Sequence, residues 1–256
     1  MRTPVLRSLT LSVLAALPVL FAGLRADAAP INYGNYSGTN VNFENVTEDS
    51  ATDPTPLYGA PTVSGDALVF SPTAEFSARS TLGAPAVDIT DGKLNVTFTS
   101  KGSTPLGQLV ISEQGDRTLI GALPTSNAGQ SIGAAVFVTV LVSEVNGVSV
   151  APYTVSGNLV FTPKSSWSLA SGDAATAATF TGTLTLDLGN ATKATLAADN
   201  TLVAFSDASS ISFIAKKQFE IGFIPPVGNP VPEPASLAVV GLGVLPLLLK
   251  RRRRSL

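Results

Sequence analysis

Apolar and polar residues alternate along several short stretches of the chain, which is the two-residue period of a β-strand. The clearest run covers residues 93–99, where Leu94, Val96 and Phe98 fall on one face. Residues 135–142 are almost continuously apolar and β-branched, which predicts a central strand buried on both faces. The other stretches with strand character are residues 67–70, 109–112, 119–122, 158–162, 181–188, 211–214 and 219–223.

Residues with turn-forming preferences lie between these stretches. The dipeptides Asp91-Gly92 and Asn146-Gly147 tolerate the positive φ angles of tight hairpins, so a turn is predicted at each. Residues 171–178 are predicted to form a loop or a single helical turn.

These patterns predict one all-β domain over residues 29–224, either an antiparallel β-sandwich or a jelly-roll-like fold. A stiff Pro-rich linker is expected to follow at residues 225–230. The lone Trp167 is expected in the core, although an exposed Trp167 would mark a surface on which sugar rings stack.

Residues 1–28 have the features of a secretory signal peptide. Arg2 and Arg7 supply a positive start, and residues 9–24 are apolar. Small residues at Ala26 and Ala28 form a cleavage site, which favours removal over the alternative of an uncleaved signal anchor.

The last 26 residues have a different character from the predicted domain. Pro232, Glu233 and Pro234 precede an uncharged apolar run at residues 235–249. As a helix this run is about 22 Å long, whereas the hydrocarbon core of a bilayer is about 30 Å thick, so it suits a temporary anchor. A basic cluster follows, and the positive-inside rule predicts that it stays cytoplasmic as a membrane stop signal. The cluster consists of Lys250, Arg251, Arg252, Arg253 and Arg254.

This order of motif, apolar helix and Arg run resembles the PEP-CTERM sorting signal of Gram-negative and related bacteria, over residues 231–256. The resemblance implies recognition by a membrane-embedded exosortase, cleavage near the Pro-Glu-Pro motif, and delivery from the inner membrane to the cell surface or extracellular matrix. Such proteins typically belong to exopolysaccharide and biofilm systems. Residues 31–61, and residues 49–61 in particular, resemble the start of mature domains in a set of planctomycete PEP-CTERM proteins. The alternative for the tail is an ordinary single-pass anchor.

Composition narrows the chemistry available to the domain. The chain has no Cys and no His, so disulfides, Cys-ligated metals and His-dependent catalytic groups are excluded. Residues 30–230 carry 8 basic and 16 acidic side chains, a net charge of −8. This balance argues against a nucleic-acid partner, which needs a basic face.

The densest acidic group contains the weak calcium candidates Glu48, Asp49 and Asp53, with Glu44 nearby. The competing interpretation of this group is a solvated N-terminal loop. A glycosidase needs two carboxyls on either side of its substrate, and nothing in the sequence singles out such a pair.

The sequence therefore predicts a non-enzymatic surface or matrix protein that needs no cofactor. The alternative is a carbohydrate-binding or adhesion module, which calcium would assist. A polysaccharide-active enzyme is the third and least favoured hypothesis.

Overall fold

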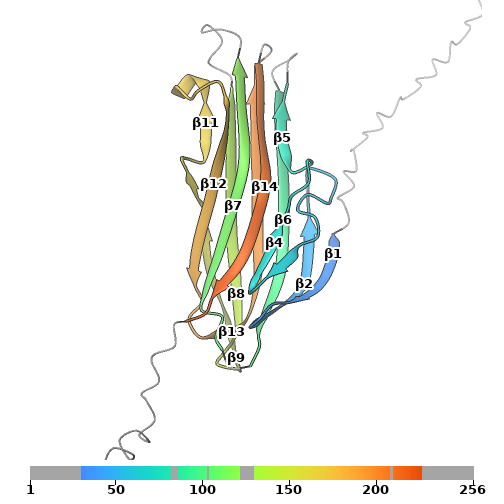
Figure 1. Ribbon diagram of the computed structural model, residues 1–256, viewed down its shortest axis with the longest axis vertical. Helices are drawn as coiled ribbons and strands as arrows, with labels where there is room; N and C mark the ends of the chain where they lie inside the picture. Colours follow the sequence, from blue (N-terminus) through green and yellow to red (C-terminus); the bar gives the residue numbers. More distant parts are fainter. Residues whose placement is uncertain (1–29, 82–85, 103, 122–129, 208–209, 227–256) are drawn as a thin grey trace, which may run out of the picture.

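The computed structural model describes residues 30–81, 86–102, 104–121, 130–207 and 210–226, which form two antiparallel β-sheets (Figure 1). The predicted all-β class is confirmed over these ranges. The single short helical element among them is the 3-10 turn η1 (Leu169–Ser171), close to the turn predicted at residues 171–178. The described ranges hold no helix long and apolar enough to cross a membrane. The predicted signal peptide and the predicted helix at residues 235–249 lie outside them.

The first sheet has the strand order β1-β2-β6-β13-β8-β11, and β9 also pairs with β8. All of these pairings are antiparallel. The strands are β1 (Ile31–Ser37), β2 (Val41–Asp49), β6 (Ala86–Ser100), β8 (Ser131–Val145), β9 (Val148–Asn158), β11 (Ser166–Ser168) and β13 (Ala191–Ser206).

The second sheet has the strand order β10-β12-β7-β14-β4-β3, and β5 also pairs with β14. It too is antiparallel throughout. The strands are β3 (Thr62–Ser64), β4 (Ala67–Phe70), β5 (Ser77–Ser80), β7 (Gln108–Gly121), β10 (Val160–Thr162), β12 (Ala177–Asp187) and β14 (Ser210–Ile224).

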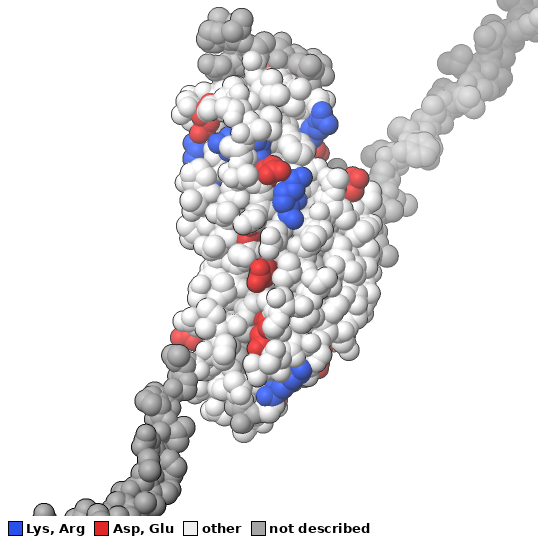
Figure 2. Space-filling model, viewed as in Figure 1, with Lys and Arg blue, Asp and Glu red and all other residues white. Residues whose placement is uncertain are grey.

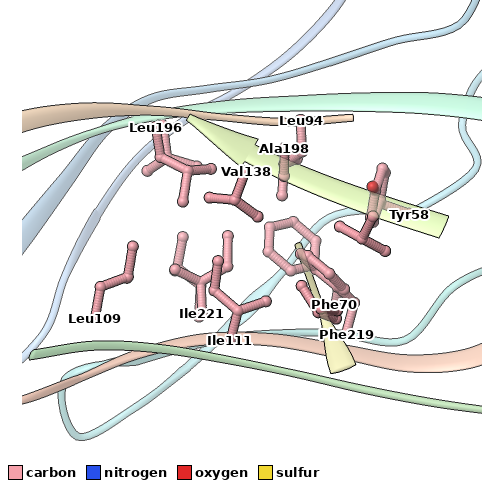
Figure 3. Close-up of a cluster of buried hydrophobic side chains, with 14 of the residues drawn as sticks. Tyr58, Phe70, Leu94, Leu109, Ile111, Val138, Leu196, Ala198, Phe219 and Ile221 are labelled. Atoms are coloured by element: carbon pink, nitrogen blue, oxygen red, sulfur yellow. The ribbon is translucent and has the colours of Figure 1, made fainter. Parts of the chain in front are cut away.

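The hydrophobic core lies between the two sheets. Leu94, Val138 and Leu196 of the first sheet face Ile111 and Ile221 of the second, and all five are fully buried (Figure 3). The central strands β6, β7, β8, β13 and β14 have 14 to 16 residues each. At about 3.4 Å per residue they are about 50 Å long, which gives the domain its elongated shape in Figure 1. The interior is therefore long enough to hold separate regions of different chemistry.

Two pairs of predicted strands are each one continuous strand. Residues 109–112 and 119–122 belong to β7 as far as Gly121, and residues 211–214 and 219–223 both lie in β14. Each predicted strand ended at the polar residues that lie between the two predicted stretches. Two of these polar residues, Glu113 and Lys216, nevertheless point inward and are buried. Residues 158–162 show the opposite error, because β9 ends at Asn158 and β10 starts only at Val160.

The hairpin predicted at Asn146-Gly147 is confirmed, with φ angles of 51° and 76° between β8 and β9. The turn predicted at Asp91-Gly92 is wrong, because both residues lie inside β6. A Cβ atom at Gly92 would come within 2.8 Å of the Phe76 ring, so this glycine makes room for packing rather than for a turn.

The prediction that residues 135–142 are buried on both faces is also wrong. Val136, Val138 and Val140 of β8 are buried, whereas Phe137 is 47% exposed and Leu141 is 44% exposed. No second layer covers the outer face of this sheet among the described residues, so its apolar outward residues meet solvent (Figure 1).

Candidate functional site

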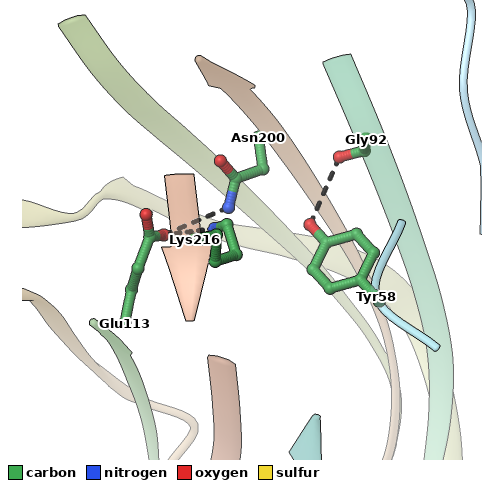
Figure 4. Close-up of polar contacts among 5 residues, drawn as sticks. All are labelled: Tyr58, Gly92, Glu113, Asn200 and Lys216. Carbon is green, nitrogen blue, oxygen red and sulfur yellow. Dashed lines mark hydrogen bonds and ion pairs between the residues drawn. The ribbon is translucent and has the colours of Figure 1, made fainter. Parts of the chain in front are cut away.

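Three polar side chains meet in the interior between the sheets. Asn200 comes from β13 in the first sheet, and Glu113 and Lys216 come from the adjacent strands β7 and β14 in the second. All three are buried. The Nζ atom of Lys216 lies 2.5 Å from Oε2 of Glu113, and Nδ2 of Asn200 donates to the same oxygen at 3.1 Å (Figure 4). One carboxylate oxygen thus joins an amine and a carboxamide across the sandwich.

Aromatic rings enclose the amine. Nζ of Lys216 lies 4.8 Å from the ring centre of Phe219, 4.9 Å from that of Phe76 and 5.8 Å from that of Tyr58. Each π-face attracts a cation, but none accepts a proton. Glu113 is therefore the proton acceptor that faces this amine.

Local backbone features place these groups. A register shift between Lys216 and Gln218 lets both Lys216 and Phe219 turn their side chains inward. The backbone N–H of Lys216 donates to the carbonyl of Phe76 at 3.0 Å. On the opposite sheet, Asn200 pairs with Gly92, whose carbonyl accepts the Tyr58 hydroxyl at 3.3 Å.

The electrostatics of the site follow from its burial. Desolvation lowers the pKa of the Lys216 ammonium to about 8, against the opposing attraction of Glu113. Burial, followed by the negative charges of Glu113 and Glu48, raises the pKa of the Tyr58 hydroxyl well above its usual range. Two further buried atoms, Oε1 of Glu113 and Oδ1 of Asn200, have no hydrogen-bond partner within the described ranges. Such orphaned acceptors are costly in an interior, and other unpartnered buried atoms belong to Arg117, Gln130 and Trp167.

A second buried cation lies elsewhere in the interior. The Arg117 guanidinium on β7 stands 5.0 Å from the ring centre of Trp167, which in turn packs against Phe180. Trp167 is 1% exposed, so the core interpretation of this residue is confirmed and its use as a sugar platform is excluded.

The acidic residues proposed for calcium do not converge on one point. Glu48 lies on strand β2 rather than in a solvated loop, and its side chain is fully buried. Its carboxylate accepts the backbone N–H groups of Leu57 and Gly59 and the Tyr33 hydroxyl, the last at 2.6 Å. These bonds hold residues 50–61 against the sheet and leave Glu48 unsuited to binding an ion.

Asp49 and Asp53 are also engaged locally. Asp49 accepts the N–H of Ser50, and Asp53 accepts the Thr52 hydroxyl. Partial burial raises the pKa of Asp91, and the negative charges of the neighbouring Asp199 and Asp53 raise it further. Among the residues with described positions, no three acidic groups are arranged to hold a metal ion.

The sorting motif at Pro232, Glu233 and Pro234 and the basic cluster at residues 250–254 lie outside the described residues, so their predicted roles remain predictions. A hollow of about 320 Å³ lies where the chain leaves the domain, lined in part by Asp187, Asn190 and Pro226. On the face shown in Figure 2, Lys and Arg are interspersed with Asp and Glu among uncharged residues.

None of the three residues of the buried cluster is a candidate that the sequence suggested. The two-residue alternation of inward and outward positions along the strands nevertheless indicated them. Glu113 is in phase with Ile111 and Asn200 with Ala198, both fully buried apolar residues. A charged residue at an inward position of a strand is the pattern that would have found the site.

No family model matches the sequence, and no curated protein matches it either. Among solved structures, the enzymatically active domain of tailspike protein 4 from bacteriophage CBA120 aligns with 58% of this chain and 19% of its own, at 11% identity and a TM-score of 0.16. The VP2 subviral particle of infectious bursal disease virus aligns with 83% of this chain and 58% of its own, at 13% identity and a TM-score of 0.15. The chain thus spans less than two thirds of either protein, and TM-scores this low carry no argument.

Proposed function

We propose that this protein is an exported structural protein of the cell surface or extracellular matrix, sorted by an exosortase-type enzyme. The observation that carries the proposal is the tail, in which Pro232, Glu233 and Pro234 precede an apolar run and a basic cluster. Residues 1–28 would direct export, and the tail would anchor the chain in the inner membrane until cleavage releases the domain.

Three properties of the domain suit a non-enzymatic role outside the cell. The finer description of its fold that we favour is a β-sandwich, whose two long sheets share one continuous core. The chain lacks His and Cys, so the commonest catalytic groups are missing. A second hollow contains both Asp66 and Glu220. Asp66, however, accepts hydrogen bonds from Asn40 and Val41 that fix the start of β2, which favours a structural role over a catalytic one.

Carbohydrate binding or adhesion is the second candidate. Phe137 and Tyr153 are exposed on the first sheet and offer aromatic faces to a sugar. In the β8–β9 ladder Tyr153 pairs with Val142, five positions along β8 from Phe137. Directly paired residues share a face, so Tyr153 points to the side of the buried Val142, whereas Phe137 points to the opposite, outer side. The two rings therefore do not make a continuous platform. Exopolysaccharide remains a partner that this proposal allows and does not require.

Variants of the tail, produced in a host that contains an exosortase, test the proposal. Glu233→Ala should leave the uncleaved chain in the membrane with its topology intact. Replacing residues 250–254 with Gln should instead let the tail pass into the periplasm, because each arginine costs about 2.5–3.5 kcal/mol to move into hydrocarbon. Asp116→Ala, a change of a half-exposed acidic residue on β7 more than 100 residues before the motif, is the control and should be processed normally.

The readouts are the intact mass of the recovered protein and protease access to a C-terminal tag. Recovery of wild-type protein that still carries Arg251–Arg254 as its main form would contradict processing of the tail.

A further inference from the structure

The buried cluster holds the three groups needed to exchange one amide for another: an amine, a carboxamide and a carboxyl that touches both. We propose that Lys216 and Asn200 become joined by an intramolecular amide bond, with Glu113 transferring the protons. The bond would tie β14 of the second sheet to β13 of the first. This inference is independent of the sorting tail, because it rests on the interior of the domain alone.

The geometry brings the reacting groups together before any bond forms. Oε2 of Glu113 is 2.5 Å from Nζ of Lys216 and 3.1 Å from Nδ2 of Asn200. The two nitrogens therefore lie no farther apart than the sum of these distances, and Cγ of Asn200 is one covalent bond beyond Nδ2. In Figure 4 the amine and the carboxamide lie beside each other at the same carboxylate oxygen.

The surroundings favour the reactive form of the amine. Nucleophilic attack needs the neutral amine rather than the ammonium. The pKa of Lys216 is lowered to about 8 because its side chain is fully buried, with Tyr58, Phe76 and Phe219 around the amine. Loss of one proton leaves Lys216 uncharged, which is the form of a buried amine that a low-dielectric interior favours.

The bond changes balance without any oxidant, reductant or outside reagent. Nζ of Lys216 gives one proton to Glu113 and attacks Cγ of Asn200, which becomes tetrahedral. Glu113 then protonates Nδ2, the bond between Cγ and Nδ2 breaks, and ammonia leaves. The new amide nitrogen gives its surplus proton back to Glu113. The products are a secondary amide, a neutral Glu113 carboxyl and one ammonia molecule.

The product can also supply a hydrogen-bond donor to one of the two orphaned acceptors of the site. Before reaction, Oδ1 of Asn200 and Oε1 of Glu113 accept no hydrogen bond from any described residue. After reaction, the protonated Glu113 becomes a donor that can bond the oxygen of the new amide, which is the former Oδ1 of Asn200. The cluster is thus imperfectly satisfied as separate side chains and better satisfied as the linked product.

The fold supplies the remaining requirement, which is orientation. Groups held at the right distance on rigid elements react with effective concentrations of about 10⁵–10⁸ M. Here each group stands near the middle of a long central strand, with hydrogen-bonded neighbours on both sides. The chain has no Cys and can form no disulfide, so an amide bond is a covalent cross-link that it can form between the two sheets.

Tryptic mapping of the purified full chain tests the bond directly. Trypsin cuts after Lys193, Lys216 and Lys217, so an unlinked chain yields the peptide 194–216. An amide at Lys216 blocks cleavage there, and the expected product is peptide 194–217, lighter by one ammonia. No backbone fragment should separate residue 200 from residue 216 in tandem mass spectrometry. A succinimide at Asn200 would lose the same mass, but it would leave Lys216 cleavable and would count against the bond.

Two variants separate the roles of the residues. Glu113→Gln should abolish the linked peptide, since Gln takes up no proton from the amine. With Glu113 intact, Asn200→Asp should give the identical linked peptide, because the reaction then releases water instead of ammonia. Recovery of wild-type peptide 194–216 in unmodified form as the main species would overturn the proposal, and so would a bond from Lys216 to Glu113. Equal linkage in Glu113→Gln would overturn the role assigned to Glu113.

Discussion

Two consecutive lysines of β14 pair with carboxylates of β7, one on the inner face of the sheet and one on the outer face. Lys216 and Glu113 have fully buried side chains, and their charged atoms are 2.5 Å apart. Lys217 and Asp116 are about half exposed, with charged atoms 3.8 Å apart. The pairs use the same residue chemistry on the same two strands, so the difference between them is one of environment.

The outer pair is screened by water, and such pairs contribute about 0–1 kcal/mol to stability. The inner pair loses its hydration, and its attraction must offset a desolvation cost of several kcal/mol per ion. A buried ion pair is thus weak evidence of a purely stabilising role. The presence of Asn200 at the same carboxylate oxygen gives the inner pair a chemistry that the outer pair lacks.

The largest expected effect comes from removing one partner of the inner pair. In a chain that carries Asn200→Ala and so cannot form the amide, Glu113→Ala should lower the free energy of unfolding by about 3–5 kcal/mol, because Lys216 is left buried without a carboxylate. Asp116→Ala in the same background is the matched control, and it should change stability by no more than about 1 kcal/mol. Urea unfolding measures both, and equal losses would remove the distinction between the faces.

A smaller loss is expected at Glu48, a buried carboxylate that contacts hydrogen-bond donors rather than a lysine. Glu48→Gln should lower the free energy of unfolding by about 1–3 kcal/mol, because the amide group turns a donor toward Tyr33 or toward the backbone N–H groups of Leu57 and Gly59. Thermal unfolding of the variant and the wild type measures the loss. Adding calcium or a chelator should leave both melting temperatures unchanged, and a calcium-dependent rise in the wild type would contradict the structural role of Glu48.

A third effect, the smallest when expressed per pH unit, is a pH dependence of the unlinked chain. The pKa of Lys216 is about 8 in the folded state and 10.5 at its ordinary value, so between these values the unfolded state holds more protons. The stability of the Asn200→Ala chain should therefore rise with pH from about 8 to 10, by about 1 kcal/mol per pH unit. Above pH 10 the raised pKa of Tyr58 acts in the opposite direction.

Adding Lys216→Met should remove the rise, whereas Lys217→Met should leave it in place. Urea unfolding at a series of pH values measures the slope. A slope that persists without Lys216 would assign the titration to another group.

The period-two pattern predicted the all-β class and the inward residues of β6 because apolar residues dominate those positions. It missed β2 although Val41 and Phe43 are buried there, and it failed above all where the inward residues are polar or small. Strand β13, the longest in the described chain, was not predicted. Alanines and Asn200 occupy much of its inner face, and these residue types have neither a preference for strands nor the bulk of typical core residues. The buried cluster was hidden for the same reason. Its three residues are 16 or more positions apart in sequence, and only the pairing of strands brings them together.

The central claim is that Lys216 is an amide rather than an ammonium in the mature fold. Nuclear magnetic resonance of the full chain, labelled with ¹⁵N at the side-chain nitrogen of lysine, tests it most directly. We expect one lysine to give an amide N–H signal with a single attached proton, and we expect this signal to vanish in Glu113→Gln and in Lys216→Arg. Lysine signals that are all those of amines or ammonium groups in the folded wild type would contradict the account.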